Sequence, residues 1–377
     1  MVDTKGSIAF VRWGAFSYIN ESVLQLLRRE FPGHSVEEIE IGDLVSTRDR
    51  RVRLAAAVRY LPSIVRGRRR MDECAARTPY YFRRLRKALL TRLGQEPYVF
   101  SFQTQSLWDA SAPGRPHFVY TDHTHLANLQ YPDFRREQLF SDAWIELERT
   151  IYHNATLTFT MTGNITRSVI EQYGCPEKRV VCVGAGSNSD PWSVGPTNPK
   201  KYSSKQVLFV GVDWERKGGP LLARAFEMVL KTHPDAHLTI VGCQPALSLP
   251  NCTTAGRVPL SEVGRYYEQA AVFCLPTRRE PFGIVFLEAM AHGLPVVGTR
   301  LGPMPDFITD DLNGYLVDPD DASGLASVLN RLLSQPSLCQ ALGREGQRLT
   351  AEYWNWQHTA ARLGRHIREC VPSLKAM

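Results

Sequence analysis

Short apolar runs and longer segments with an apolar residue at every third or fourth position alternate along this chain. The short runs predict buried strands, whereas the wider spacing predicts helices with one buried side. Near-continuous apolar strands separated by helices are typical of a parallel sheet that is covered on both faces. We therefore predict an α/β fold whose strands include residues 7–12, 36–41, 98–102, 117–120, 206–212, 237–242, 271–275 and 294–297.

The length of the chain predicts two domains, because 377 residues exceed what one ordinary hydrophobic core holds. The sequence from residue 190 to residue 204 is rich in Pro, Gly, Ser and Lys, which is typical of a linker. We place the first domain at residues 1–190, the linker at 191–204 and the second domain at 205–355.

Composition is that of a globular protein, with 43% apolar and 22% charged residues. The eight cysteines lack the close pairing that metal and redox sites show, which favours reduced thiols. The N-terminal residues lack the features of a signal peptide, and no apolar run reaches membrane-spanning length. These observations predict a cytoplasmic protein.

Positive charge is concentrated between Arg48 and Arg92, a segment that we call the basic patch. It holds 15 basic and 3 acidic residues, a local charge of +12, so the rest of the chain carries −5 of the total of +7. Apolar residues from Leu54 to Val65 give its first half an amphipathic face. In its second half the pattern points four basic side chains outward, namely Arg83, Arg84, Arg86 and Lys87.

Two interpretations of the basic patch remain open. It is either the solvated surface of two helices, or a platform for an anionic surface, which is a membrane or a phosphate-bearing acceptor. The second interpretation makes the protein peripheral on the inner face of the membrane. Nucleic acid is not expected as a partner, because no nucleic-acid-binding fold or stacking motif accompanies the charge.

The most informative stretch of the sequence runs from residue 278 to residue 297. Glu280 lies in the loop that follows a strand, and Pro281 favours an extended conformation there. A helix follows, with Glu288 one to two turns inside it and Gly293 placed to end it. The first amides of this helix belong to Gly283, Ile284 and Val285, and free amides at a helix N-terminus suit an anion. Carboxylates beside such amides suit a ligand with both hydroxyls and phosphates.

The whole phrase Glu-Pro-Phe-Gly-Ile-Val-Phe-Leu-Glu-Ala-Met-Ala-His-Gly-Leu-Pro-Val-Val, from Glu280 to Val297, resembles the signature of family 4 retaining glycosyltransferases. The resemblance covers nearly everything from Gln206 to the C-terminus and is fainter before it. It implies the GT-B fold, in which two doubly wound, Rossmann-like parallel-sheet domains face a cleft. It also implies that the last helix, at residues 356–377, crosses back onto the first domain.

The resemblance implies roles for individual residues. Arg216 and Lys217 match the basic pair that grips the donor diphosphate, and Glu288 would accept from ribose hydroxyls. Glu280 would bind the hydroxyls of the transferred sugar, and His123 would face the sugar or the acceptor. His123 has a second interpretation, as a loop histidine that holds backbone groups. The full set of implied donor contacts is Arg216, Lys217, Phe282, Gly283, Ile284, Val285, Glu288, Arg257, Val258 and Gly14.

The activity that the resemblance implies is transfer of a hexosyl unit from a UDP- or GDP-sugar to a hydroxyl. The acceptor would be a glycan or a lipid-linked molecule in the synthesis of cell-surface glycans or glycolipids. Two alternatives remain, namely a nucleotide-sugar epimerase and a catalytically silent GT-B binding protein. No cofactor besides the donor is expected.

A metal is not expected either. Asp318 and Asp320 form an Asp-x-Asp pair like the metal-binding mark of the other major glycosyltransferase fold. However, Asp320 and Asp321 directly precede a helical pattern, where aspartates act as N-terminal caps. We therefore interpret these residues as turn and cap residues.

Overall fold

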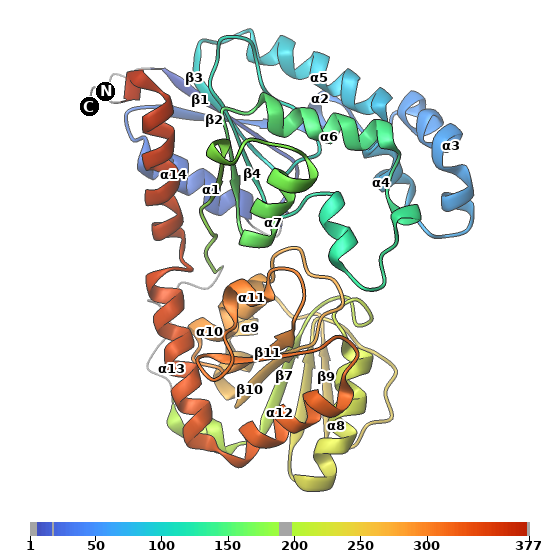
Figure 1. The fold of residues 1–377 in the computed structure, drawn as a ribbon, viewed down its shortest axis with the longest axis vertical. Coiled ribbons are helices and arrows are strands. Elements are labelled where there is room, and N and C mark those ends of the chain that lie inside the picture. The colour runs from blue at the N-terminus through green and yellow to red at the C-terminus, as the bar shows by residue number, and fades with distance from the viewer. Residues whose placement is uncertain (1–5, 17–18, 188–197, 375–377) are drawn as a thin grey trace. The chain divides into compact units, whose positions relative to one another are not determined.

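The computed structural model describes residues 6–16, 19–187 and 198–374, and it divides into two compact units (Figure 1). The first unit comprises Met1–Ala127, Arg135–Val183 and Ala360–Met377. The second comprises Asn128–Phe134 and Gly184–Thr359. Each unit is built on one sheet.

The first sheet has six parallel strands in the order β2-β1-β3-β4-β5-β6. Its strands are β1 (Ser7–Arg12), β2 (Ser35–Glu40), β3 (Tyr98–Thr104), β4 (His117–Thr121), β5 (Leu157–Thr160) and β6 (Val180–Cys182). Phe102 on β3 packs against Phe10 on β1 and Phe159 on β5, so aromatic rings cross the buried face of the sheet. The strands predicted in this half of the chain are confirmed.

Helices cover both faces of the first sheet because each parallel connection returns through one. They are α1 (Ile19–Glu30), α2 (Ile41–Leu44), α3 (Arg50–Val65), α4 (Met71–Ala76), α5 (Pro79–Leu93), α6 (Asp142–Asn154), α7 (Gly163–Arg167) with the π-helical turn η4 (Ser168–Gln172), and α14 (Trp356–Cys370). The last of these lies alongside α1 (Figure 1), where Arg368 forms an ion pair with Glu30 at 2.9 Å. The C-terminal helix therefore belongs to the first unit from Ala360 onward.

The second sheet also has six parallel strands, in the order β12-β11-β10-β7-β8-β9. Its strands are β7 (Gln206–Val210), β8 (His237–Val241), β9 (Cys252–Gly256), β10 (Val272–Leu275), β11 (Val296–Thr299) and β12 (Gly314–Val317). The sequence pattern did not indicate β9, because this edge strand reads Cys-Thr-Thr-Ala-Gly and is half-buried, without an apolar run.

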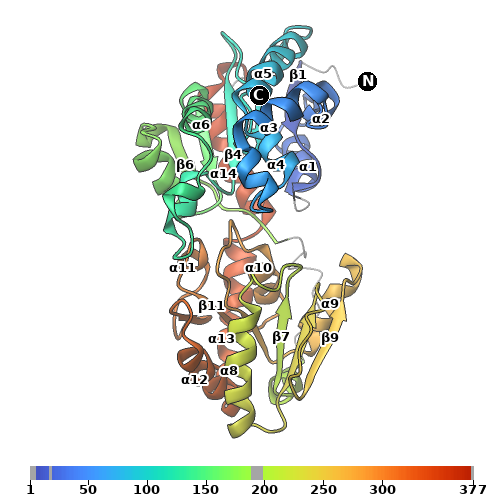
Figure 2. The ribbon, with the colours of Figure 1, turned by 90° about the vertical axis from the view of Figure 1, so that its right-hand side faces the viewer.

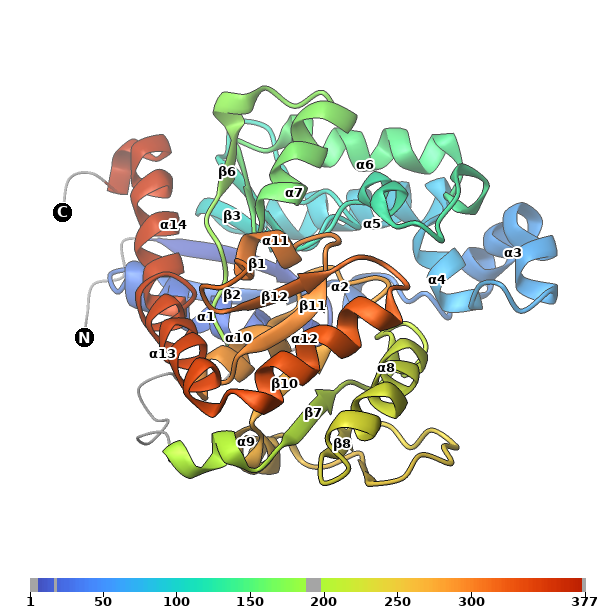
Figure 3. The same cartoon turned by 60° about the horizontal axis from the view of Figure 1, so that its bottom comes forward.

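The helices of the second unit are α8 (Gly219–Thr232), α9 (Leu260–Gln269), α10 (Ile284–Ala291), α11 (Met304–Phe307), α12 (Ala322–Ser334) and α13 (Pro336–Glu352). Helices α8 and α12 lie side by side against the sheet (Figures 2 and 3). Gly293, with φ of +71°, directly follows the last turn of α10, as predicted. The molecule thus has the predicted fold class of two doubly wound parallel sheets flanked by helices.

Part of the predicted linker lies outside the described residues, which resume at Asn198. Directly after Asn198, Pro199–Ser203 forms a short 3-10 helix, η6, in which Tyr202 is buried. The predicted start of the first helix at Ser17 also lies outside the described residues. No helix in the described part of the chain is both long and apolar enough to span a membrane.

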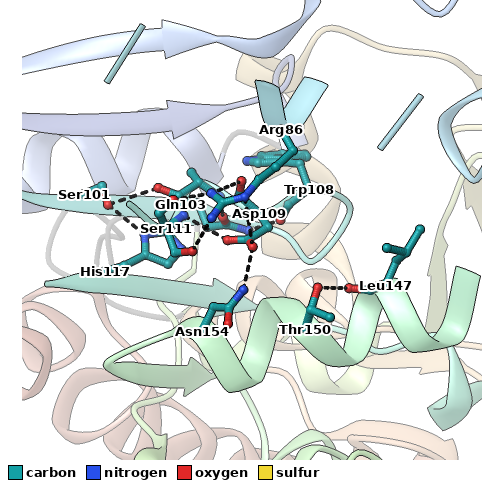
Figure 4. A network of polar contacts seen from close by, with 11 residues as sticks. Arg86, Ser101, Gln103, Trp108, Asp109, Ser111, His117, Leu147, Thr150 and Asn154 are labelled. Atoms are coloured by element: carbon teal, nitrogen blue, oxygen red, sulfur yellow. Dashed lines mark hydrogen bonds and ion pairs between the residues drawn. The ribbon is translucent and has the colours of Figure 1, made fainter. Parts of the chain in front are cut away.

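The prediction that Arg86 points outward was wrong. Its guanidinium forms an ion pair with the buried Asp109 at 3.4 Å and donates to the Ser111 hydroxyl at 3.0 Å (Figure 4). Asn154 donates to the same Asp109 carboxylate at 2.8 Å. Burial lowers the pKa of the neighbouring His117 to about 4, so a neutral imidazole shares a hydrogen bond with Ser101. Arg86 is therefore a structural cation of the first unit.

Candidate functional site

The order of strands in the second sheet marks where a ligand would bind. The chain passes from β7 to β8 on one side and later returns to β10 on the other side of β7. In open α/β sheets, ligands bind outside the carboxyl ends of the strands at such a reversal. Lys217 follows β7 and Glu280 follows β10, so the reversal brings together residues 63 positions apart.

The loops after β7 and β10 are in direct backbone contact. The Arg278 amide donates to the Arg216 carbonyl at 2.9 Å, and the Arg216 guanidinium donates to the Arg279 carbonyl at 2.8 Å. Gly218 permits this approach, because a Cβ there would lie 1.7 Å from the Pro276 carbonyl oxygen. Its φ of +76° also favours glycine.

Lys217 and Glu280 form a buried ion pair at the centre of the site. Their side chains are 10% and 7% exposed, and the Lys217 ammonium contacts Oε2 of Glu280. The Glu280 carbonyl accepts a hydrogen bond from the Tyr131 hydroxyl at 2.6 Å, which holds the backbone of the loop. Burying two charges is costly unless they are paired, so this contact fixes both side chains in one position.

Arg216 lies at the rim, next to a cavity of about 410 Å³. An ion pair with Asp213 at 3.4 Å holds its guanidinium there. The cavity is also lined by Asp133, Arg279 and Asp320, so charges of both signs face it. Lys217 and Glu280 do not line this cavity, which therefore adjoins the ion pair without containing it.

Helix α10 begins next to the ion pair, with Gly283 at its N-cap in a left-handed conformation of φ +97°. The first backbone hydrogen bond of the helix runs from the Phe286 amide to the Gly283 carbonyl at 2.9 Å. The amides of Gly283, Ile284 and Val285 come before it, in the position that suits an anion. The ring of Phe282, which the resemblance implied as a donor contact, is buried against Phe307 and anchors the loop.

Glu288 lies inside α10 and is 5% exposed. The hydroxyl of Tyr267 on α9 donates to its Oε2 at 2.9 Å. Burial, and then the charge of Glu288, raises the pKa of Tyr267, which keeps this hydroxyl a donor. Tyr267 stacks in turn on His292, with ring centroids 5.1 Å apart. Glu288 is therefore held by Tyr267, a residue of the neighbouring helix that the sequence did not single out.

Asn128–Phe134 is a second contribution that the sequence did not indicate. This segment folds onto the second unit, where Asp133 accepts two hydrogen bonds from Arg279, at 3.0 and 2.9 Å. The hydrogen bonds and charge of Arg279 lower the pKa of Asp133, which keeps its carboxylate ionised. No local pattern distinguishes these residues from an ordinary loop, because their partners lie far away in the sequence.

The other predicted donor residues occupy different places. Arg257 and Val258 follow β9, where Arg257 is exposed and Val258 half-buried. Gly14 follows β1, at the strand reversal of the first sheet, and its amide donates to both Glu40 carboxylate oxygens at 3.1 Å. A phosphate would therefore compete with Glu40 for that amide.

His123 lies in the first unit, directly after β4. Its carbonyl accepts from the Thr121 hydroxyl at 2.7 Å, so its backbone is fixed. The second histidine of the His-x-His pair turns inward, where His125 Nε2 accepts from the Phe140 amide at 2.7 Å. Burial and nearby cations lower the pKa of His125 to about 3, so it is neutral.

A buried carboxylate supports this loop from α6. Glu148 accepts hydrogen bonds from the His125 amide at 2.9 Å and from the Tyr152 hydroxyl at 3.1 Å. Burial raises the pKa of Glu148 to about 7. Sequence reasoning missed this network, although an acid within an otherwise apolar helical face is a signal that could have found it.

The three aspartates before α12 already have partners. Asp321 caps the helix through a hydrogen bond from the Gly324 amide at 2.8 Å, as predicted, and Asp320 forms an ion pair with Arg278 at 2.7 Å. Asp318 lies 3.9 Å from Arg300. Among the residues that the structure describes, no group of three or more His, Cys, Asp or Glu side chains is placed to hold a metal ion.

Comparison with known sequences places this site in a family. The family model described as "Glycosyl transferases group 1" matches residues 204–335. D-inositol 3-phosphate glycosyltransferase of Corynebacterium jeikeium is 29% identical over 60% of this chain and 60% of its own length. A GDP-mannose-dependent alpha-(1-6)-phosphatidylinositol monomannoside mannosyltransferase of Mycolicibacterium smegmatis is 31% identical over 39% of this chain and 44% of its own length. The matched region thus spans less than two thirds of either relative.

Solved structures match over nearly the whole chain. Sucrose-phosphate synthase from Thermosynechococcus elongatus superposes with a TM-score of 0.71 at 17% identity, covering 98% of this chain and 100% of that one. An Anabaena protein in complex with UDP and glucose gives a TM-score of 0.65 at 14% identity, covering 96% and 99%. At such low identity these matches establish the fold alone. Together with the phrase from Glu280 to Val297, the sequence matches place residues 204–335 among the group 1 glycosyltransferases, and the chain as a whole has the GT-B-like fold of two parallel-sheet units.

Proposed function

We propose that this protein transfers a hexosyl unit from a UDP- or GDP-sugar to a hydroxyl of a glycan or lipid-linked acceptor, with retention at the anomeric carbon. The observation that carries the proposal is the buried Lys217–Glu280 pair beside the N-terminus of α10, at the strand reversal of the second sheet. A cation and free amides there suit a diphosphate, and a carboxylate suits sugar hydroxyls.

Positive charge at this place would assist the chemistry directly. When the bond between the anomeric carbon and the diphosphate oxygen breaks, the leaving nucleoside diphosphate gains negative charge. Lys217, Arg216 and the amides of Gly283 to Val285 oppose that charge from fixed positions, which is a major source of catalysis. The acceptor hydroxyl forms the new bond to the same carbon, and its proton passes to the oxygen of the departing diphosphate.

Carboxylates would recognise the uncharged parts of the donor. Glu288 accepts from the ribose hydroxyls, with its orientation held by Tyr267. Glu280 accepts from hydroxyls of the transferred sugar, and Arg257 with Val258 lies near the base. His123 belongs to the first unit, and we assign it a contact with the sugar or the acceptor.

The name of one relative supports a nucleotide-sugar donor together with a lipid-linked acceptor. One relative is a D-inositol 3-phosphate glycosyltransferase, and another is a GDP-mannose-dependent enzyme acting on a phosphatidylinositol monomannoside. A structural neighbour was solved with UDP and glucose.

A thermal-shift panel tests donor binding. We expect one UDP- or GDP-sugar to raise the Tm of the parent, because a ligand that binds only the folded state stabilises it by about 2.7 kcal/mol at 100 times its Kd. Glu288→Gln should weaken that shift, whereas Glu227→Gln, a change at an exposed position of α8, should leave it unchanged. No shift with any nucleotide-sugar would contradict the proposal.

Product analysis with the donor so found separates the alternatives. Transfer consumes donor only when an acceptor is present and gives a product of retained anomeric configuration. An epimerase would change the sugar without an acceptor, and a silent binding protein would return the donor unchanged.

Activity should survive removal of divalent metal ions. Asp321 and Asp320 are engaged by Gly324 and Arg278, while Lys217 and Arg216 supply positive charge at the proposed diphosphate site. We expect transfer rates within a few-fold of the untreated enzyme after chelation with EDTA. Loss of activity that manganese or magnesium restores would show that the aspartates were misinterpreted.

A further inference from the structure

The outer face of helix α3 is apolar, although it faces away from the core of the first unit. Leu54, Val58, Leu61 and Val65 are 64%, 80%, 52% and 75% exposed. Their spacing of four, three and four residues puts them on one side of the helix. We call these four residues the outer stripe. The buried residues of α3, which are Val52, Ala56 and Tyr60, lie on the opposite side.

The structure holds the outer stripe firmly in place. Asp49 caps the start of α3 by accepting from the Arg51 amide at 2.8 Å and the Val52 amide at 3.3 Å. Near its end, the buried Tyr60 hydroxyl donates to the Arg77 carbonyl at 2.9 Å. The sequence predicted an amphipathic helix here. In the structure the apolar residues of α3 lie on two sides of the helix, and those on the inner side pack against the core of the first unit.

Cations surround the outer stripe. Several basic residues of the basic patch have structural partners, for example Arg84 with Asp49 at 2.9 Å and Arg69 with the Leu139 carbonyl at 2.9 Å. The remaining exposed cations form no ion pair with any other residue in the described part of the chain. These are Arg48, Arg50, Arg51, Arg53, Arg59, Arg66, Arg68, Arg70, Arg83 and Lys87.

A shallow apolar groove continues the outer stripe toward the start of α5. Its volume is about 490 Å³, and Leu54, Val58 and Tyr80 line it, with Arg51 and Arg59 beside them. Figures 1 and 3 show α3 at the outer edge of the first unit, and the high exposure of the outer stripe means that its side chains face solvent. Exposed apolar surface of this extent marks an interaction site in most proteins.

We propose that α3 is an interfacial helix that docks the first unit on an anionic lipid bilayer. The outer stripe enters the boundary between headgroups and acyl chains, and the surrounding arginines contact lipid phosphates. An apolar face flanked by exposed cations is the pattern of helices that lie in the plane of a membrane. The density of unpaired positive charge favours an anionic bilayer over an apolar protein surface. The proposal involves neither Lys217 nor Glu280 and is independent of the donor site.

Vesicle sedimentation tests the proposal with the full-length protein. We expect the parent to sediment with vesicles of phosphatidylcholine and phosphatidylglycerol in equal parts, and to stay in solution with phosphatidylcholine alone. The double variant Leu54→Ser/Leu61→Ser should bind the anionic vesicles at least about tenfold more weakly than the parent, because it removes apolar surface area that would leave water on binding. Both residues are exposed, so the change leaves the core intact.

A matched control uses the same substitution elsewhere. Leu260→Ser/Leu312→Ser changes two leucines of the second unit that are 51% and 42% exposed, and it should bind vesicles like the parent. Arg50→Ser/Arg51→Ser/Arg53→Ser should also weaken binding, and its remaining binding should be less sensitive to salt.

Three results would overturn the proposal. The first is equal recovery of the parent with neutral and anionic vesicles. The second is unchanged binding of Leu54→Ser/Leu61→Ser, which would reduce the interaction to surface charge. The third is a parent that dimerises in solution through the outer stripe, detected as a dimer that Leu54→Ser/Leu61→Ser converts to monomer.

Discussion

Replacing Lys217 with alanine is expected to remove about 2 to 4 kcal/mol of transition-state stabilisation, the scale of one fixed electrostatic contact. This corresponds to a loss of roughly 30- to 1,000-fold in kcat/KM. The physical reason is that Lys217 is the buried cation at the strand reversal, where the departing diphosphate would gain charge. Steady-state kinetics with the donor found by thermal shift measures the effect.

Stability must be separated from chemistry in this experiment. Lys217→Ala leaves Glu280 buried without its cation, and breaking a buried pair costs about 3 to 5 kcal/mol of unfolding free energy. The double variant Lys217→Met/Glu280→Gln removes both charges at similar volume and should regain most of that stability. It should remain as inactive as Lys217→Ala.

Lys205→Ala is the matched control for a lysine in an ion pair. Lys205 contacts Asp235 at 2.7 Å, but both lie at the surface, so we expect parental activity and a stability change below about 1 kcal/mol. If a correctly folded Lys217→Ala kept activity within a few-fold of the parent, the proposed phosphate contact would be wrong.

Gly218→Ala is expected to destabilise the second unit by about 2 to 5 kcal/mol. Alanine at the observed φ of +76° costs about 1 to 2 kcal/mol, because its Cβ crowds the following carbonyl. A further 1 to 3 kcal/mol or so comes from overpacking, since the new Cβ would lie 1.7 Å from the Pro276 carbonyl oxygen. The loops that carry Lys217 and Glu280 would have to separate to relieve this contact.

Gly114→Ala is the matched control, because Gly114 has a similar φ of +72° and nothing within 4 Å of its ideal Cβ position. Gly114→Ala should lose only the roughly 1 to 2 kcal/mol of unfolding free energy that alanine costs in the left-handed backbone conformation. Hydrogen exchange of the β7 amides for Gly218→Ala and of the β3 amides for Gly114→Ala measures each unit separately. Equal losses of stability in the two variants would show that the loop at Gly218 does not pack tightly against the loop at Pro276.

The sequence by itself determined the elements that depend on local chemistry. Residues 8–11 and 207–210 are apolar throughout, which is the pattern of strands covered on both faces. Gly293 ends α10 because a left-handed residue is needed there, and Asp321 caps α12 because its short carboxylate reaches the Gly324 amide. These signals act within a few residues, so they are readable without the fold.

Only the tertiary structure decided which side chains are buried and which partners they contact. Arg86 and Arg84 are neighbours of one chemistry in one helix, yet Arg86 meets the buried Asp109 and Arg84 the surface Asp49. Likewise, the apolar positions of α3 looked alike in the sequence, but Val52, Ala56 and Tyr60 are buried in the core, whereas the outer stripe stays exposed. Which side of a helix is buried depends on residues distant in the chain, and no local pattern encodes them.

The site shows the same division. The phrase from Glu280 to Val297 and the Arg216–Lys217 pair were identifiable from residue types and spacing. Lys217 and Glu280 meet as an ion pair because β7 and β10 are neighbours in the sheet. Tyr131 and Asp133 join the site from a segment far upstream in the sequence. Electrostatic contacts are short-ranged in space but indifferent to sequence separation, so the sequence supplied the candidate groups and the folded chain decided which of them meet.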